Sequence, residues 1–435
     1  MARDIVANNL RERAAWKWIA MGIVLVATIG FDFALARDSE TANINWLTIS
    51  KATLALGLIV WCLLRIQRWW ASINRYSAPW LLLVFWLVVT AVYSISPAIT
   101  AVTALTLLAM LMFQLYVVQE LETPQLVWTM LLSLSGFLAV SLVLYFVAPD
   151  LARTTAWNFV EQQTQDSGRL QGLTGGPNNL GKMAAFSLVL LGVFYRDLRQ
   201  ANYNRIILIG MGLLAALDLV LSGSRTSILA LVIAGGVVAM IRFPKLIAPV
   251  LVVGALGLLI LIPNFAGIAT KLSRSGNPNE IMTATGRTYV WAIAWHFIQL
   301  KPLLGYGYRT TIYLMPTYAK SIGMYYAPPT PHNAILTLWF DAGIPAVLMF
   351  ISAVGSTIYY CIANRYWKIL TIFMYWFCTT FTEPGGFSGV ADNASLSLFL
   401  PIALLAVQPT LKVAEASRTR RRRRRVVSDS VRELA

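Results

Sequence analysis

Two arginines and one histidine are the residues whose types and positions best suit chemistry. Arg225 lies in the polar turn LSGSRTS, Arg287 lies in TGRTYVW, and His332 follows the stiff segment PPTP. The planar guanidinium group matches a diphosphate, because it donates two parallel hydrogen bonds. An apolar run follows His332, and the positive end of the helix predicted there favours the neutral imidazole, which accepts a proton. Together they predict a site that holds a diphosphate and deprotonates a hydroxyl group.

Five further residues are candidates for binding a substrate at this site. Arg169 and Lys182 flank the polar segment GRLQGLTGGPNNLGK and would complete a ring of positive charge around a lipid diphosphate. Asn333 is placed to orient the imidazole or a sugar. Tyr306 and Tyr308 offer flat apolar faces with one polar tip, which suits stacking on sugars.

Each of these residues also has a purely structural interpretation. Arginines at a membrane surface extend their charge into the headgroup region, and tyrosines line the same interface. His332 would then be an ordinary interfacial cap of the helix that follows it. The other histidine, His296, is expected on the polar face of a helix predicted over 286–299, where Thr285 is a suitable N-cap, and we assign it no role.

The composition predicts a membrane protein. The 435 residues are 57% hydrophobic and only 12% charged, whereas soluble domains carry about 25% charged residues. Apolar stretches of about 20 residues recur along the chain, which is the length that crosses a bilayer as a helix. Such spans must satisfy their own backbone hydrogen bonds, so the predicted fold is an all-α polytopic bundle. Windows of about 19 residues predict about twelve spans, centred on 17–35, 46–64, 79–97, 99–118, 126–148, 179–195, 204–221, 227–242, 246–263, 333–360, 366–381 and 394–410.

The distribution of arginine and lysine predicts the orientation of the spans. These residues gather before the first span and in the short loops after spans two, six, eight and ten, and an arginine-rich tail follows the last span. Basic residues stay on the cytoplasmic side, so both termini are expected there. The segment 149–178, the turn around Arg225, the loop 264–331 and the segment 382–393 then face the opposite side. In a bacterium this is the periplasm, which lacks nucleotide sugars, so an enzyme working there needs a donor that carries its own leaving group.

This pattern divides the chain into five parts. We expect a cytoplasmic N-terminus over 1–15, nine spans over 16–263, a periplasmic loop with an amphipathic helix over 264–331, three spans over 332–410, and a cytoplasmic tail over 411–435. The arginine run of the tail faces anionic lipid rather than nucleic acid, because it follows a span. The three cysteines have no paired spacing, and no set of residues has the spacing of a metal site. No cofactor is expected.

The motifs resemble those of the O-antigen ligase and O-antigen polymerase superfamily, which includes exopolysaccharide polymerases. The family pattern of an arginine followed by a leucine at a helix start is similar to the segment from Arg225 to Leu229. Its histidine and later glycine match His332 and Gly343. The pieces between them resemble Gly286-Arg287 with Trp291, and Pro302 with Gly305 and Gly307. The similarity covers about 165 to 350.

The resemblance implies a GT-C-type glycosyltransferase in the inner membrane that uses neither metal nor nucleotide. Its donor would be a glycan on undecaprenyl diphosphate. Arg225 and Arg287 would hold the diphosphate as it leaves, and His332 would activate the acceptor hydroxyl, with inversion at the anomeric carbon.

Three functions remain open at this point. A ligase would pass the glycan to a sugar of the lipid A–core, a role in lipopolysaccharide biosynthesis, whereas a polysaccharide polymerase would pass it to another lipid-linked repeat. The loop 264–331 carries no separate soluble domain, which favours the ligase. A transporter or flippase of the same lipid would use the arginines without chemistry, and it would show an internal repeat. No such repeat is visible in the sequence.

Overall fold

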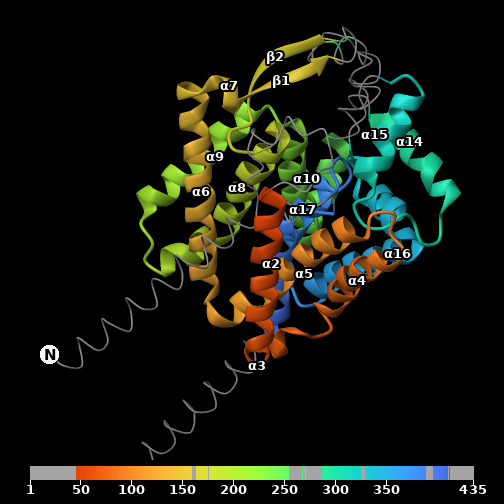
Figure 1. Ribbon diagram of the computed structural model, residues 1–435. Helices are drawn as coiled ribbons and strands as arrows, with labels where there is room; N and C mark the ends of the chain where they lie inside the picture. The colour runs from red at the N-terminus through yellow and green to blue at the C-terminus, as the bar shows by residue number, and fades with distance from the viewer. Residues whose placement is uncertain are drawn as a thin grey trace, which may run out of the picture.

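The computed structural model describes residues 46–158, 163–174, 176–253, 287–324, 329–387 and 395–409, together with residues 267, 270 and 411. This part of the chain is a bundle of helices with one small hairpin at its upper end (Figure 1). Of the predicted parts, the N-terminus 1–15, the span 17–35, most of the span 246–263 and all but Leu411 of the tail 411–435 lie outside the described residues.

The first group of helices surrounds α5 (Pro97–Glu120), which is buried along most of its length. Its neighbours in the chain are α2 (Trp46–Leu64), α3 (Ile66–Trp69), α4 (Ala78–Val89) and α6 (Thr123–Val147). A proline lies in the first turn of α4, α5 and α6, where its missing N–H costs nothing. Glu122 and Gln125 form a capping box at the start of α6, and this satisfies two further N–H groups. The local sequence thus explains where these helices begin.

The second group contains the helices that begin near the predicted site. These are α8 (Pro177–Gln200), α9 (Arg205–Ser222), α10 (Arg225–Arg242), α14 (Arg287–Leu300), α15 (Thr311–Ser321), α16 (Ala334–Ala363) and α17 (Trp367–Thr379). The helix Ser395–Pro409 follows and is almost wholly buried. α17 packs against α8 and α10, and α14 and α15 lie beside α16 (Figure 1).

Helices occupy the predicted spans wherever the structure describes them. Of the described helices, five are long and apolar enough to cross a membrane, namely α5, α6, α9, α10 and α16. A sixth candidate is the pair Thr53–Leu64 and Ile66–Ser72, which meet at a bend of 78°. α8 has suitable length, but both of its ends are polar. The protein is therefore a helical, multi-pass membrane protein, and the number twelve remains a prediction.

The expectation of an all-α fold was wrong for the segment 149–178. After the short helix α7 (Pro149–Ala152), this segment forms an antiparallel hairpin of β1 (Arg153–Asn158) and β2 (Gln163–Leu170), with an irregularity between Thr154 and Thr155. A hairpin satisfies its backbone groups within itself, so it needs no apolar periodicity of the kind that marks a span. The hairpin returns the chain to the bundle at Arg169, which pairs with Thr154 in the register.

The predicted span 333–360 is two helical segments joined by a kink at Gly343. This glycine has φ 72° and ψ −173°, and Pro345 follows it. The loop before α15 fills the break, since Ile344 N–H donates to the Pro302 carbonyl and Gly307 N–H donates to the Asp341 carbonyl. A Cβ on Gly343 would lie 2.1 Å from the Leu303 carbonyl oxygen, so only glycine fits. The glycines that resembled a family motif therefore have a packing role here.

Candidate active site

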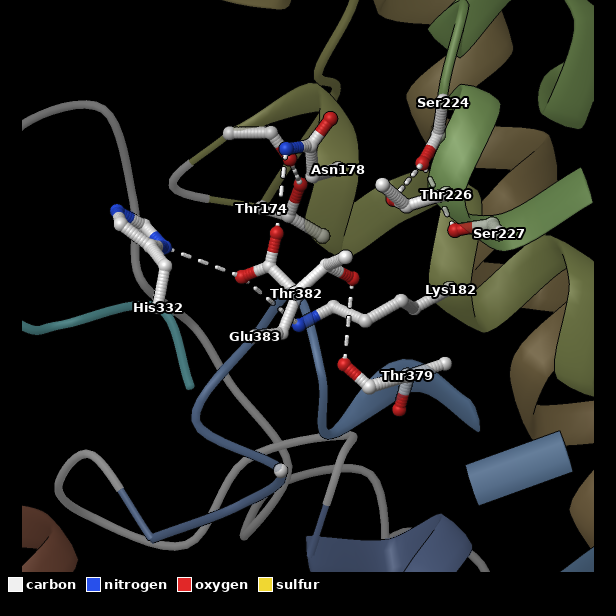
Figure 2. A network of polar contacts seen from close by, with 12 residues as sticks. Thr174, Asn178, Lys182, Ser224, Thr226, Ser227, His332, Thr379, Thr382 and Glu383 are labelled. Carbon is white, nitrogen blue, oxygen red and sulfur yellow. Dashed lines mark hydrogen bonds and ion pairs between the residues drawn. The ribbon is translucent and has the colours of Figure 1, made fainter. Parts of the chain in front are cut away.

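A buried glutamate, Glu383, lies at the centre of a cluster of polar side chains (Figure 2). It follows α17 in a tight turn, in which its N–H donates to the Thr379 carbonyl at 2.9 Å. Only 7% of its side chain is exposed. A carboxylate is costly to bury without partners, so its surroundings decide its charge.

The two oxygens of Glu383 have different partners. Oε1 accepts hydrogen bonds from Arg287 Nη2 at 3.2 Å and Asn178 Nδ2 at 3.3 Å. Oε2 lies 3.4 Å from His332 Nδ1 and 3.9 Å from Lys182 Nζ. Arginine, lysine and histidine from three separate elements thus meet on one carboxylate.

Arg169 joins this cluster through Asn178. Its Nη2 donates to Asn178 Oδ1 at 3.0 Å, and its Nε donates to the Ser222 carbonyl at 2.8 Å. The second bond satisfies a carbonyl at the end of α9, where Gly223 has the left-handed conformation that ends many helices. Arg169 is therefore both a structural partner of α9 and a positive charge at the edge of the cluster.

Close packing brings the start of α10 to the start of α8. A Cβ on Gly181 would lie 2.3 Å from the Ser224 Cβ, so the two backbones approach where a larger residue would not fit. Ser224 and Ser227 lie beside the helix that carries Lys182 (Figure 2). Arg225 is the first residue of α10 and has an exposed side chain. The structure thus places Arg225 on the cluster's side of the bundle, on an element next to Lys182.

The backbone around His332 is tied to the turn that carries Glu383. Asn333 caps α16 by accepting from Leu336 N–H at 3.0 Å, and Ala334 N–H donates to the Thr380 carbonyl at 3.0 Å. Trp291 of α14 donates to the Pro331 carbonyl at 2.8 Å. His332 itself has φ 51°, an uncommon conformation for a residue with a Cβ. These bonds hold the imidazole against Glu383, and Asn333 serves as the helix cap.

The basic side chains around Glu383 keep it ionised. Burial by itself raises the pKa of this carboxyl, but Lys182, His332 and Arg287 outweigh it and lower the pKa from its ordinary 4.5 to about 2. Glu383 is therefore an anion at neutral pH and a counter-ion for the cluster. Arg169, Lys182 and Arg287 supply more positive charge than one carboxylate cancels, and this excess favours an anionic ligand.

The structure does not bring the two predicted sugar-binding tyrosines to this cluster. Tyr308 has no exposed surface, and its backbone bonds to the hydroxyls of Thr90 and Thr100. Tyr306 is 8% exposed and packs against Phe297 and Phe340. A ring enclosed by protein has no free face for a sugar, so both tyrosines have a packing role. The loop 302–308 carries both tyrosines inward because Pro302, Tyr306 and Gly307 pair with the backbone of α16 near its kink.

Two carboxylates lie within the predicted spans, and no contact described for either of them reaches the cluster. Asp341 is fully buried and caps the start of α15, where it accepts from Arg309 N–H at 2.8 Å and Thr311 N–H at 3.2 Å. Asp218 is also fully buried, and neither of its oxygens has a hydrogen-bond partner among the described residues. The described residues hold no group of three metal-ligating side chains, and independence of metal stays a prediction.

Sequence reasoning missed Glu383 and Asn178. Asn178 lies inside a segment whose arginine and lysine were singled out, and Glu383 lies in the turn TEPGGF after an apolar run. The available signal was charge balance: several cations were expected on one side of the membrane, and a nearby acid was needed to compensate them.

Comparison with known proteins agrees with this arrangement. Residues 210–351 match the family model described as O-Antigen ligase. The matched segment is 142 of the 435 residues. The matched segment contains Arg225, Arg287, His332 and Gly343, whereas Glu383 lies outside it. No protein with curated annotation matches the chain. The match over 210–351 supports the resemblance in the motifs, so this part of the chain is similar to the O-antigen ligase family of membrane proteins.

Proposed function

We propose that this protein is an O-antigen ligase-type glycosyltransferase that moves a glycan from undecaprenyl diphosphate to an acceptor hydroxyl. The observation that carries the proposal is the cluster on Glu383, which brings Arg287, Lys182 and His332 together from three elements. Members of the family are membrane glycosyltransferase-like enzymes, and lipid-linked glycans are the substrates that the family implies. We place the site on the periplasmic side of the inner membrane, with both termini in the cytoplasm.

The cluster supplies the two kinds of group that the reaction needs. The bond between the anomeric carbon and the diphosphate oxygen breaks, and the diphosphate leaves with the electron pair. Arg287, Arg225 and Lys182 stabilise its charge, and such preorganised cations are worth most where water is excluded. His332 takes the proton of the acceptor hydroxyl as the new glycosidic bond forms on the opposite face, which inverts the anomeric carbon. No metal or nucleotide takes part in this scheme.

The acceptor distinguishes a ligase from a polymerase. A sugar of the lipid A–core as acceptor makes the enzyme a ligase, and a second lipid-linked repeat makes it an O-antigen or exopolysaccharide polymerase. Both reactions use the same leaving group and the same base. We favour the ligase because the loop 264–331 has only about 68 residues in the sequence, which is modest for a separate soluble domain.

The test is deletion of the gene followed by gel analysis of the envelope polysaccharides. Loss of attachment with intact polymer is expected for a ligase, whereas single-repeat products would identify a polymerase. Loss of both polymer and attachment, with lipid-linked donor retained on the inner leaflet, would instead identify a flippase and contradict the proposal.

Complementation with His332→Ala is the sharper form of this test. The variant should lose transfer by a factor of about 10² to 10⁴, the usual contribution of a general base, while it still binds the donor. His296→Ala is the matched control, because His296 stacks on Tyr318 at 4.8 Å and lies outside the cluster. Normal product from His332→Ala would remove the general-base role.

A further inference from the structure

We propose that Glu383 is a positioning residue that couples the base to the leaving-group site. One oxygen orients the His332 imidazole, and the other competes with the donor diphosphate for Arg287. This inference rests on the proposed function, and it assigns a residue outside the segment that the family match covers.

The first part of the inference follows from the geometry of the imidazole. Glu383 Oε2 faces His332 Nδ1 at 3.4 Å, and the other ring nitrogen points away from the glutamate (Figure 2). The histidine side chain is 32% exposed and the glutamate side chain only 7%. An Nδ1–H bond to a carboxylate fixes the tautomer and leaves Nε2 as the proton acceptor. Since Glu383 is an anion at neutral pH, it also stabilises the imidazolium that forms when His332 takes the proton.

The second part follows from the partners of the other oxygen. Oε1 accepts from Arg287 Nη2 at 3.2 Å, and the arginine side chain is only 15% exposed. The guanidinium group has five N–H donors, so a diphosphate can bind the donors that Glu383 leaves free, and the two anions then compete for one positive charge. Asn178 and Lys182 remain on the carboxylate and keep it in place. Binding of the donor would therefore leave Glu383 more fully available to His332.

This arrangement predicts opposite effects on binding and on transfer. In Glu383→Gln, the competing charge on Arg287 disappears, so undecaprenyl diphosphate should bind at least about 3-fold more tightly. Transfer should fall at least about 10- to 100-fold, the loss typical when a carboxylate that orients a metal-bound histidine is removed. Glu383→Asp keeps the negative charge on a shorter side chain. Its binding of undecaprenyl diphosphate and its rate of transfer should both lie between those of the unaltered protein and Glu383→Gln.

The experiment measures binding of undecaprenyl diphosphate to the full-length protein in nanodiscs, and glycan transfer in membrane vesicles over a range of pH. In Glu383→Gln, the acidic limb of the transfer profile should move to lower pH, because the protonated imidazole loses its anionic partner. Glu120→Gln is the matched control, since Glu120 also pairs with an arginine, Arg68 at 2.9 Å, outside the cluster. It should leave both measurements unchanged.

Each result decides between the alternatives. Tighter binding with slower transfer and a displaced acidic limb supports the proposal. Loss of binding and transfer together in both Glu383 variants would show a purely structural role, and an unmoved acidic limb would show that Glu383 does not act through His332. Failure of the unaltered protein to bind undecaprenyl diphosphate would overturn the proposed function itself.

Discussion

At the scale of single residues, the site depends on one buried carboxylate and the side chains that neutralise it. Removing one partner of a buried ion pair is costly, because the other charge stays behind without compensation. Glu383 has several partners, so loss of one cation still leaves it compensated. Substitutions of the cations are therefore expected to affect chemistry more than folding.

Arginine-to-lysine substitutions test whether transfer needs the two parallel hydrogen bonds that a guanidinium group can donate to a diphosphate. Arg287→Lys keeps a positive charge near Glu383 but cannot bind a diphosphate through two parallel bonds, so transfer should fall at least about 100-fold with folding retained. Arg225→Lys should have a similar effect. Arg68→Lys is the control, because Arg68 is 54% exposed and pairs with Glu120 outside the cluster. Full turnover in both site variants would mean that the two arginines only anchor the protein at the membrane surface.

The ionisation of Glu383 predicts how stability depends on pH. Its folded-state pKa of about 2 lies below the ordinary 4.5, so its contribution is complete above about pH 4.5 and is lost as pH falls toward 2. The difference in thermal-unfolding midpoint between the unaltered protein and Glu383→Gln should therefore shrink as the pH falls from about 4.5 toward 2, because the carboxylate takes up a proton over this range. A difference that grows over the same range would contradict this assignment.

At the scale of elements, the break in α16 positions the outer loop. The chain from Pro302 to Gly307 pairs with the kink: Tyr306 and Gly307 donate to carbonyls of α16, and the Pro302 carbonyl accepts from Ile344 N–H. This pairing carries α15 against α14 and α16, and α14 in turn bonds to the Pro331 carbonyl beside His332. The kink thus links helix packing to the position of the base.

Substitution of the kink glycine should therefore be severe. Gly343→Ala puts a Cβ at a left-handed φ and 2.1 Å from a carbonyl oxygen, which should cost about 3 kcal/mol or more. Gly355→Ala on the same helix is the control, because nothing lies within 4 Å of the added Cβ. It should be neutral or slightly stabilising. Equal thermal-unfolding midpoints for the two variants would show that the kink tolerates a side chain.

At the scale of the whole molecule, the proposal requires the cluster and the basic loops to lie on opposite sides of a membrane. The loop after α8 carries Ala201, and the end of α15 carries Ser321; both residues are exposed. In a background with Cys378→Ala, where Cys62 and Cys361 are fully buried, Ser321→Cys should react with an impermeant maleimide in spheroplasts. Ala201→Cys should react only after permeabilisation. The reverse pattern would put the cluster in the cytoplasm, where an undecaprenyl-linked donor on the outer leaflet cannot reach it.

Much of the architecture could be predicted because each spanning helix satisfies its own backbone within one apolar run. The runs therefore marked the long helices, namely α2, α4, α5, α6, α8, α9, α10, α16 and α17, and the prolines and caps marked where several begin. The short helices α3, α7 and α15 were not predicted. The hairpin β1–β2 could not be found this way, because its stability comes from pairing between two short polar strands.

The sequence by itself indicated a helical membrane protein that resembles the O-antigen ligase superfamily. It singled out Arg225, Arg287 and His332 as catalytic candidates, and Arg169, Lys182, Asn333, Tyr306 and Tyr308 as substrate-binding candidates. Only the tertiary structure decided which of them meet. Asn178 and Glu383 are 205 positions apart, yet they share a hydrogen bond. Residue type shows what a side chain can do, but packing between distant helices decides which charge compensates which, and local patterns do not contain that information.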